Sequence, residues 1–155
     1  MTITTEQVKE LRDKTGISVM QCKKALEEAG GDMVKAVEAL KAKGTEIAMK
    51  KSARTMASGA IAAYLHSNGK MGSLVEVHSE TDFVANNAEF RQLADDIAMH
   101  AAAMDPLDVD ELLTQPYIKD PSQTISDLVK GAVQKFGERI EIIRFARFDT
   151  AASKE

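Results

Sequence analysis

The chain has 155 residues, of which 44% are hydrophobic, and this length allows one ordinary domain, or a core domain with a small module, to bury an apolar core. Its 20 basic and 24 acidic residues give a formal net charge of −4, so no global field attracts nucleic acid or an anionic membrane. A protein or a small ligand is the remaining class of binding partner.

Cys22 is the single cysteine of the sequence, which excludes an internal disulfide and a metal cluster of several thiolates. We expect it to be a small buried hydrophobe. The sequence shows neither a leader of the signal-peptide kind nor an apolar run of the roughly 20 residues that span a bilayer. A cytoplasmic location without membrane contact is therefore expected.

The first 44 residues are predicted to form a compact three-helix module. Thr4, Ser18 and Asp32 each have the position of a helix N-cap before apolar residues at helical spacing. Glycine-containing turns follow the three patterns, and Gly44 marks the expected C-terminal end of the third helix.

Two apolar side chains begin the second predicted helix. Val19 and Met20 lie in its first turn, beside the turn at Gly16. Because a three-helix module cannot bury every apolar side chain, these two residues can be core or can contact a partner, and the pattern leaves both open.

Residues 45–57 are expected to form a basic linker that extends the third helix. This region and the end of that helix carry Lys41, Lys43, Lys50, Lys51 and Arg54. No aromatic residues are interleaved with these basic ones, and the whole chain is acidic, so a solvated face is expected and nucleic acid is not expected as a partner.

Residues 58–150 are predicted to form a core with the element order β-β-α-α-β. An Asn68-Gly69 turn between two strand-like runs indicates a hairpin, although the pattern leaves open which of its faces is buried. The expected elements span residues 60–66, 71–79, 88–103, 125–136 and 139–148. We therefore predict an α+β fold with a three-stranded, mainly antiparallel sheet covered by helices, followed by a frayed tail at 151–155.

Phe83 lies in the junction between the second predicted strand and the first long helix of the core. It stands in the run Thr81-Asp82-Phe83-Val84-Ala85-Asn86. A phenylalanine in such a turn can fold back as a core plug, or it can point into solvent for a partner to receive. The pattern alone leaves both alternatives open.

The motifs of nucleotide-hydrolysing and dinucleotide-binding loops and of zinc-protease helices are absent from the sequence. No serine or cysteine stands in the context of a known nucleophile. We therefore expect no enzyme activity and no cofactor.

The three histidines do not predict a metal site. His66 and His78 lie on the two strands of the hairpin, and at about 3.3 Å per residue they are roughly 23 Å apart, too far to share one ion. His100, at the polar edge of its helix, is expected to be solvated or to cap a helix end.

Three stretches, in this order, resemble the bacterial translation elongation factor Ts family. Residues 11–26 (LRDKTGISVMQCKKAL) are similar to its first signature, on a ubiquitin-associated-like three-helix module. Residues 75–86 (VEVHSETDFVAN) are similar to its most distinctive signature, and residues 137–145 (GERIEIIRF) resemble the closing strand of its core. The family commonly has Gly and Met where this chain has Ser18 and Val19.

The resemblance implies a guanine-nucleotide exchange factor that binds elongation factor Tu in its GDP-bound and nucleotide-free forms. By resemblance, a loop of Thr81, Asp82, Phe83 and Val84 enters near the Mg²⁺ site of the partner and promotes GDP release, with Phe83 as a wedge. Val19, Met20 and Lys23 are implied to anchor the N-terminal module on the partner. A ubiquitin-associated-like binding module without exchange activity is the alternative.

The resemblance also bears on oligomeric state. Full-length members carry a second core repeat, whereas here only a short segment separates Met104 from Gln115, so the chain resembles a single-repeat form. His66 resembles a partner-contacting histidine of the second repeat. The resemblance therefore suggests a homodimer in which one protomer offers Phe83 and the second offers His66. Monomer and homodimer both remain open.

Overall fold

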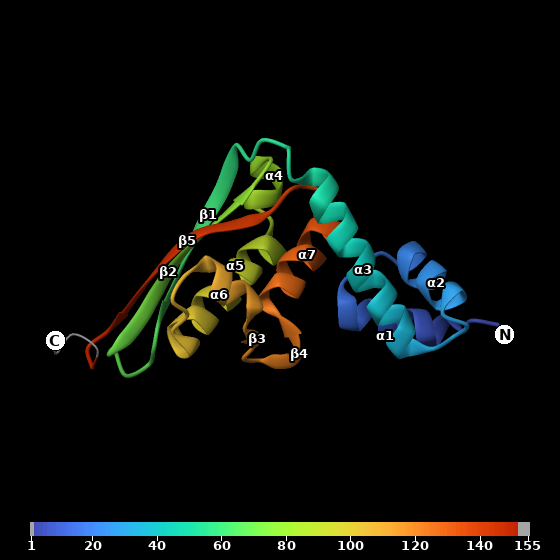
Figure 1. The fold of residues 1–155 in the computed structure, drawn as a ribbon, viewed down its shortest axis with the longest axis horizontal. Coiled ribbons are helices and arrows are strands. Elements are labelled where there is room, and N and C mark those ends of the chain that lie inside the picture. Colours follow the sequence, from blue (N-terminus) through green and yellow to red (C-terminus); the bar gives the residue numbers. More distant parts are fainter. Residues whose placement is uncertain (1, 152–155) are drawn as a thin grey trace. The chain divides into compact units, whose positions relative to one another are not determined.

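The structure is a computed structural model that describes residues 2–151 (Figure 1). The chain divides into two compact units. The first comprises the residues up to Ala53 together with Lys130–Glu138, and the second comprises Arg54–Val129 together with the residues from Arg139 onward.

The expected tail lies largely beyond the described residues. Ala151 donates its backbone N–H to the Asp149 carboxylate at 2.9 Å, and residues 152–155 are outside the described part. Within residues 2–151, no helix combines the length and the apolar character that a bilayer crossing requires.

The first unit contains three N-terminal helices, as predicted. They are α1 (Thr5–Thr15), α2 (Val19–Glu28) and α3 (Met33–Lys51). Side-chain oxygens of Thr4, Ser18 and Asp32 accept hydrogen bonds from the first-turn N–H groups, which confirms all three N-caps. The helices enclose one apolar core, formed by Val8, Leu11, Ile17, Cys22, Ala25, Leu26, Ala36 and Leu40.

The expected end of the third helix at Gly44 is wrong, because α3 continues to Lys51. Gly44 is buried within the helix, and a Cβ at this position would lie 3.2 Å from Gln134 Oε1 and 3.7 Å from Lys130 Cβ. The glycine therefore allows the C-terminal half of α7 (Ile125–Phe136) to approach α3 closely, rather than ending the helix.

The second unit is built on a three-stranded antiparallel sheet, as predicted. Its strands β1 (Ser58–Leu65), β2 (Met71–Ser79) and β5 (Glu141–Asp149) lie in the order β1-β2-β5. The hairpin turns where expected, because the N–H of His66 bonds to the carbonyl oxygen of Met71 at 2.9 Å.

One face of this sheet is covered by α5 (Ala88–Met104), which packs along all three strands (Figure 1). Ala62, Val75 and Val77 point to the covered face and are buried, and Phe90 and Ile97 of α5 are fully buried. Because side chains alternate along a strand, the residues next to these three in the sequence point to the opposite face of the sheet. We call this opposite face, which α5 does not cover, the open face.

A segment of short elements follows α5, in the stretch between the helices expected at residues 88–103 and 125–136. It contains α6 (Val109–Thr114) and a two-stranded ribbon of β3 (Pro116–Tyr117) and β4 (Asp120–Thr124). Thr124 then caps α7, since its hydroxyl accepts the N–H of Asp127 at 3.1 Å.

The expectation that His100 is solvated or caps a helix end is wrong. His100 is fully buried, its Nδ1 accepts the N–H of Ile118 at 3.2 Å, and its Nε2 lies 2.9 Å from Gln115 Oε1. These contacts require the neutral tautomer with the proton on Nε2. Burial lowers the pKa of His100, against a smaller opposite effect of the Gln115 hydrogen bond.

Candidate partner-binding sites

The Phe83 turn, residues 81–86, follows the last residues of β2 and contains the four-residue helix α4 (Asp82–Ala85). Thr81 is its N-cap, because its hydroxyl oxygen accepts the N–H of Val84 at 3.4 Å. The turn closes with the N–H of Asn86 on the carbonyl oxygen of Asp82 at 2.9 Å. Figure 1 shows α4 at the end of the sheet where β1 begins.

Phe83 points away from the core. Its side chain is 84% exposed, whereas Val84 and Ala85 beside it are buried. Because these two smaller residues already fill the space under the turn, the structure does not place Phe83 as a core plug. The result is a single exposed aromatic ring on a short, capped turn.

Two hydroxyl groups hold the start of this turn to the sheet. Ser79 donates to the carbonyl oxygen of Thr81 at 3.0 Å, and Ser58 donates to the carboxylate of Asp82. The carboxylate of Asp82 is therefore engaged within the chain, and Thr81 supplies the N-cap.

The predicted anchor residues share one exposed face at the start of α2. Val19 is 53% exposed and Met20 is 80% exposed, while Cys22 and Leu26 of the same helix are fully buried. Lys23 is exposed and lies 3.8 Å from Glu27 in an ion pair. Such an exposed pair contributes about 0–1 kcal/mol, so Lys23 can exchange it for an interaction with a partner.

The open face of the sheet is a third apolar surface. Its exposed large side chains are Ile61, Leu65, Leu74 and Phe148. Leu65 and Phe148 both pair with Gly72 of the central strand. Sequence reasoning did not identify this surface, because the strand residues are apolar on both faces and the alternation that marks a solvated face is weak.

His66 lies at the turn end of the same hairpin. Its side chain is partly buried, and its Nδ1 is 3.0 Å from the hydroxyl of Tyr64. The structure therefore places His66 and Phe83 at opposite ends of the hairpin, since β1 begins beside the Phe83 turn and ends before His66.

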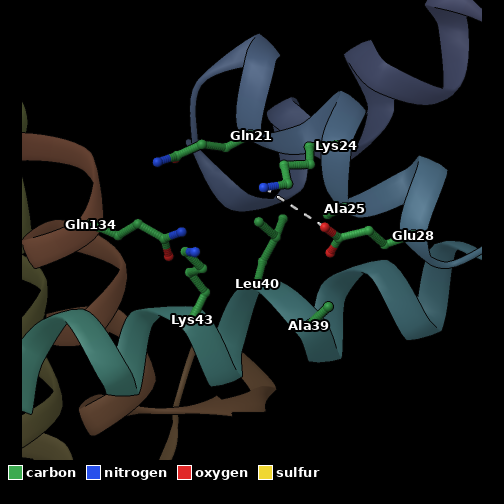
Figure 2. A pocket seen from close by; sticks show the side chains of 8 residues that line it. All are labelled: Gln21, Lys24, Ala25, Glu28, Ala39, Leu40, Lys43 and Gln134. Atoms are coloured by element: carbon green, nitrogen blue, oxygen red, sulfur yellow. Dashed lines mark ion pairs between the residues drawn. The ribbon is translucent and has the colours of Figure 1, made fainter.

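A small pocket of about 80 Å³ lies within the first unit. Figure 2 shows Gln21 and Lys24 from α2, Lys43 from α3, and Gln134 from α7 around it. Lys24 pairs with Glu28 at 3.9 Å. Because a water molecule occupies about 30 Å³ of liquid, this volume holds a few waters and is too small for a nucleotide.

Burial affects two further titratable side chains, Cys22 and Tyr117, in the described part of the chain. Among residues 2–151, no three His, Cys, Asp or Glu side chains are grouped to hold a metal ion. Burial raises the pKa of Cys22, which disfavours the reactive thiolate. Burial also raises the pKa of Tyr117 to about 12.

Comparison with known proteins gives one consistent result. A family model described as "Elongation factor TS" matches residues 80–155. The chain is 39% identical to elongation factor Ts of Acetivibrio thermocellus, over 95% of this chain and 89% of that protein. It is also 39% identical to elongation factor Ts of Thermodesulfovibrio yellowstonii, over the full length of both chains.

The relatives differ in how much of their own length this chain covers. Elongation factor Ts of Clostridium kluyveri is 46% identical over 94% of this chain, but the match covers only 47% of that protein. The alignment with the Thermodesulfovibrio protein runs over 199 positions, whereas this chain has 155 residues. At least 44 aligned positions, the difference between the two numbers, therefore face a gap in this chain.

Proposed function

The chain belongs to the elongation factor Ts family, and from this premise we propose that it is a guanine-nucleotide exchange factor for elongation factor Tu. The family places the chain in translation elongation. Because translation elongation takes place in the cytoplasm, the proposal includes a cytoplasmic location. The observation that carries the proposed activity is the 84% exposed ring of Phe83 on a capped turn.

Exchange requires a binding preference and no catalytic group. A phosphate-loop GTPase holds its nucleotide through backbone amides, a lysine and an octahedral Mg²⁺. A factor that binds the nucleotide-free conformation more tightly shifts the population toward it. By linkage, the nucleotide weakens the binding of the factor by the same ratio.

The Phe83 turn is suited to act as a wedge near the Mg²⁺ site of the partner. A phenylalanine ring has only two side-chain torsions, so it loses little entropy when it is inserted between helices. Mg²⁺ tolerates little distortion of its octahedron, so a small displacement of its ligands favours release. Thr81, Asp82 and Val84 hold the ring in place through the cap, the Ser58 contact and burial.

Residues 1–44 act as the anchor module, through Val19, Met20 and Lys23. Their common exposed face on α2 supplies an apolar contact with one adjacent cation. Residues 45–57 connect this module to the expected core of residues 58–150. In the structure, α3 continues to Lys51, and Lys130–Glu138 belong to the first unit. The affinity of the anchor keeps the wedge at a high local concentration on the partner.

The proposal includes a homodimer, in which a second copy of the chain covers the open face of the sheet. The exposed side chains of Ile61, Leu65 and Phe148 form an apolar surface of the kind that marks an interaction site. The resemblance to a single-repeat form, in which His66 matches a partner-contacting histidine of the second repeat, supports a second copy as the occupant. One protomer offers Phe83, and its partner offers His66.

The direct test mixes the protein with elongation factor Tu loaded with fluorescent GDP and follows release by stopped flow. We expect release to accelerate with the concentration of the factor until it saturates. A release rate that stays at the spontaneous value would contradict the proposal. Such a result, combined with complex formation, would favour the alternative of a binding module without exchange activity, which the exposed Val19 and Met20 would also support.

The oligomeric state is tested by light scattering. We expect a dimer for the parent, and a monomer with slower exchange for Leu65→Asp, since a buried unpaired carboxylate is costly. A parent protein that is monomeric and exchanges nucleotide at its full rate would rule out the dimer.

A further inference from the structure

Glu80 joins three segments of the second unit, immediately before the Phe83 turn. Its carboxylate oxygen Oε2 accepts the backbone N–H of Arg139 at 2.8 Å and lies 3.6 Å from Nη1 of Arg54. Arg139 in turn donates from its Nη1 to the carbonyl oxygen of Arg54 at 2.6 Å. The three residues thus form a closed triangle of contacts.

Arg54 and Arg139 occupy special places in the chain. Each is the first residue of the second unit after the chain leaves the first unit, at Ala53 and at Glu138 respectively. The carboxylate of Glu80 therefore contacts two segments of the second unit at the residues with which they begin, Arg54 and Arg139. The residue that follows Glu80 is Thr81, the N-cap of α4.

Of these two contacts of Glu80, the backbone hydrogen bond with Arg139 is stronger than the ion pair with Arg54. The side chain of Glu80 is only 17% exposed, and a hydrogen bond from an N–H to a shielded carboxylate is strengthened by its charge. Arg54 is 53% exposed and 3.6 Å away, so its pairing contributes little. Without an acceptor at position 80, the N–H of Arg139 would lose this partner.

We infer that Glu80 is a positioning residue for nucleotide exchange. It attaches the Phe83 turn to the segments that begin at Arg54 and Arg139. The turn is then held in place when the Phe83 ring contacts the partner. A loosely supported turn would move when the ring meets the partner, and the helices of the partner would then stay in place. Even a small misplacement of the Phe83 ring is therefore expected to lower the rate of GDP release. This inference rests on the proposed exchange function.

The kinetic test compares Glu80→Ala with Glu80→Gln in the fluorescent GDP assay. For Glu80→Ala we expect the saturated release rate to fall about tenfold or more, while the half-saturating concentration changes little because the anchor is intact. Glu80→Gln keeps an oxygen acceptor for the Arg139 N–H, so its saturated rate should stay within about threefold of the parent.

Glu141→Ala is the matched control. Its carboxylate binds the guanidinium of Arg139 at 3.1 and 3.0 Å but does not accept the Arg139 backbone N–H. We expect the parent rate for this variant. A parent-like saturated rate for Glu80→Ala, or a Glu80→Gln variant as slow as Glu80→Ala, would overturn the inference.

Amide hydrogen exchange on the free protein tests the same inference without the partner. Glu80→Ala should exchange faster at Arg139 and across residues 81–86, with unchanged protection at Val75 and Val77 in the sheet core. Unchanged protection of the turn would overturn the positioning role. If the parent fails to accelerate GDP release, the proposed function fails, and the hydrogen-exchange result alone then decides whether Glu80 holds the turn.

Discussion

The hydroxyl of Ser58 donates a hydrogen bond to the carboxylate of Asp82. This contact joins the first residue of β1 to the first residue of α4, and the next residue along the chain is Phe83. The exposed ring therefore stands on a turn that is capped by Thr81 and tied to the sheet by Ser58. In the proposed exchange function this attachment matters, because a turn with few ways to relax would keep the ring in place against the helices of the partner.

Phe83→Ala should lower the saturated rate of GDP release by at least about tenfold, since the wedge is lost while its support remains. The half-saturating concentration should change less, because the anchor still binds. The same stopped-flow titration measures both quantities. Leu107→Ala is the control, since Leu107 is also highly exposed, at 89%, but lies outside the turn. A Phe83→Ala variant with the parent rate would show that the wedge assignment is wrong.

Met20→Asp should give the opposite kinetic pattern. A carboxylate in an apolar contact is desolvated without a partner, so the half-saturating concentration should rise, by about tenfold for each 1.4 kcal/mol lost. The saturated release rate should remain near that of the parent. Val34→Asp introduces the same charge at another exposed position of the first unit, 68% exposed on α3, and should leave both quantities unchanged. Equal effects of the two variants would argue against a specific anchor on α2.

Local signals in the sequence predicted much of the secondary structure. The caps at Thr4, Ser18 and Asp32 and the turn at Asn68-Gly69 depend on residues three or four positions apart, so a sequence pattern contains them. The antiparallel pairing of β1 with β2 followed from the same reasoning, because short turns favour antiparallel neighbours. The position of β5 beside β2 was not predicted, since no short turn joins the two strands.

The errors arose where distant segments decide the outcome. Gly44 carries a local helix-stop signal, yet the approach of Gln134 and Lys130 places it inside a helix. His100 has a polar environment by helical spacing, yet Gln115 and Ile118 cover it. Gln134 and Lys130 are far from Gly44 in the sequence, and Gln115 and Ile118 lie beyond the end of α5 at Met104. The helical spacing around Gly44 and His100 therefore carries no information about these partners.

Phe83 shows how a local pattern can leave two alternatives open. Whether it is buried depends on what fills the space under the turn, and Val84 and Ala85 fill it. Its exposure therefore follows from the packing of its neighbours, which sequence spacing alone does not specify. The resemblance to known signatures supplied the expectation that the pattern could not.

Stability should decrease as the pH falls below about 6.5, the ordinary pKa of histidine, because of His100. Burial lowers the pKa of His100 in the folded state, so in this range the unfolded chain binds a proton that the folded chain refuses. The free energy of unfolding then falls with decreasing pH by up to about 1.4 kcal/mol per pH unit, until the lowered pKa is reached.

Urea unfolding between pH 5 and pH 8 measures this dependence. His100→Gln should be less stable than the parent at pH 8, because the Ile118 N–H loses its ring-nitrogen acceptor. The difference in stability between the two proteins should shrink as the pH falls, since only the parent contains the group that titrates. A difference that is constant with pH would contradict the buried, neutral state of His100.

Gly59→Ala should destabilise the protein through the start of β1. A Cβ at Gly59 would lie 2.7 Å from Cδ2 of His78 and 2.8 Å from the carbonyl oxygen of Val77. The histidine ring can turn aside, but the carbonyl belongs to β2 and cannot move alone, so the beginning of β1 must shift. Such overpacking typically costs about 1–3 kcal/mol. The shift also reaches Ser58, so we expect slower saturated GDP release together with a lower urea midpoint.

Gly131→Ala separates this steric effect from the general effect of replacing a glycine. Gly131 lies in α7, and a Cβ there would meet no atom within 4 Å. Alanine is favoured over glycine inside a helix by up to about 1 kcal/mol, so this variant should be more stable than the parent. If Gly59→Ala also raised the urea midpoint, β1 could adjust without strain. The steric argument at Gly59 would then be wrong.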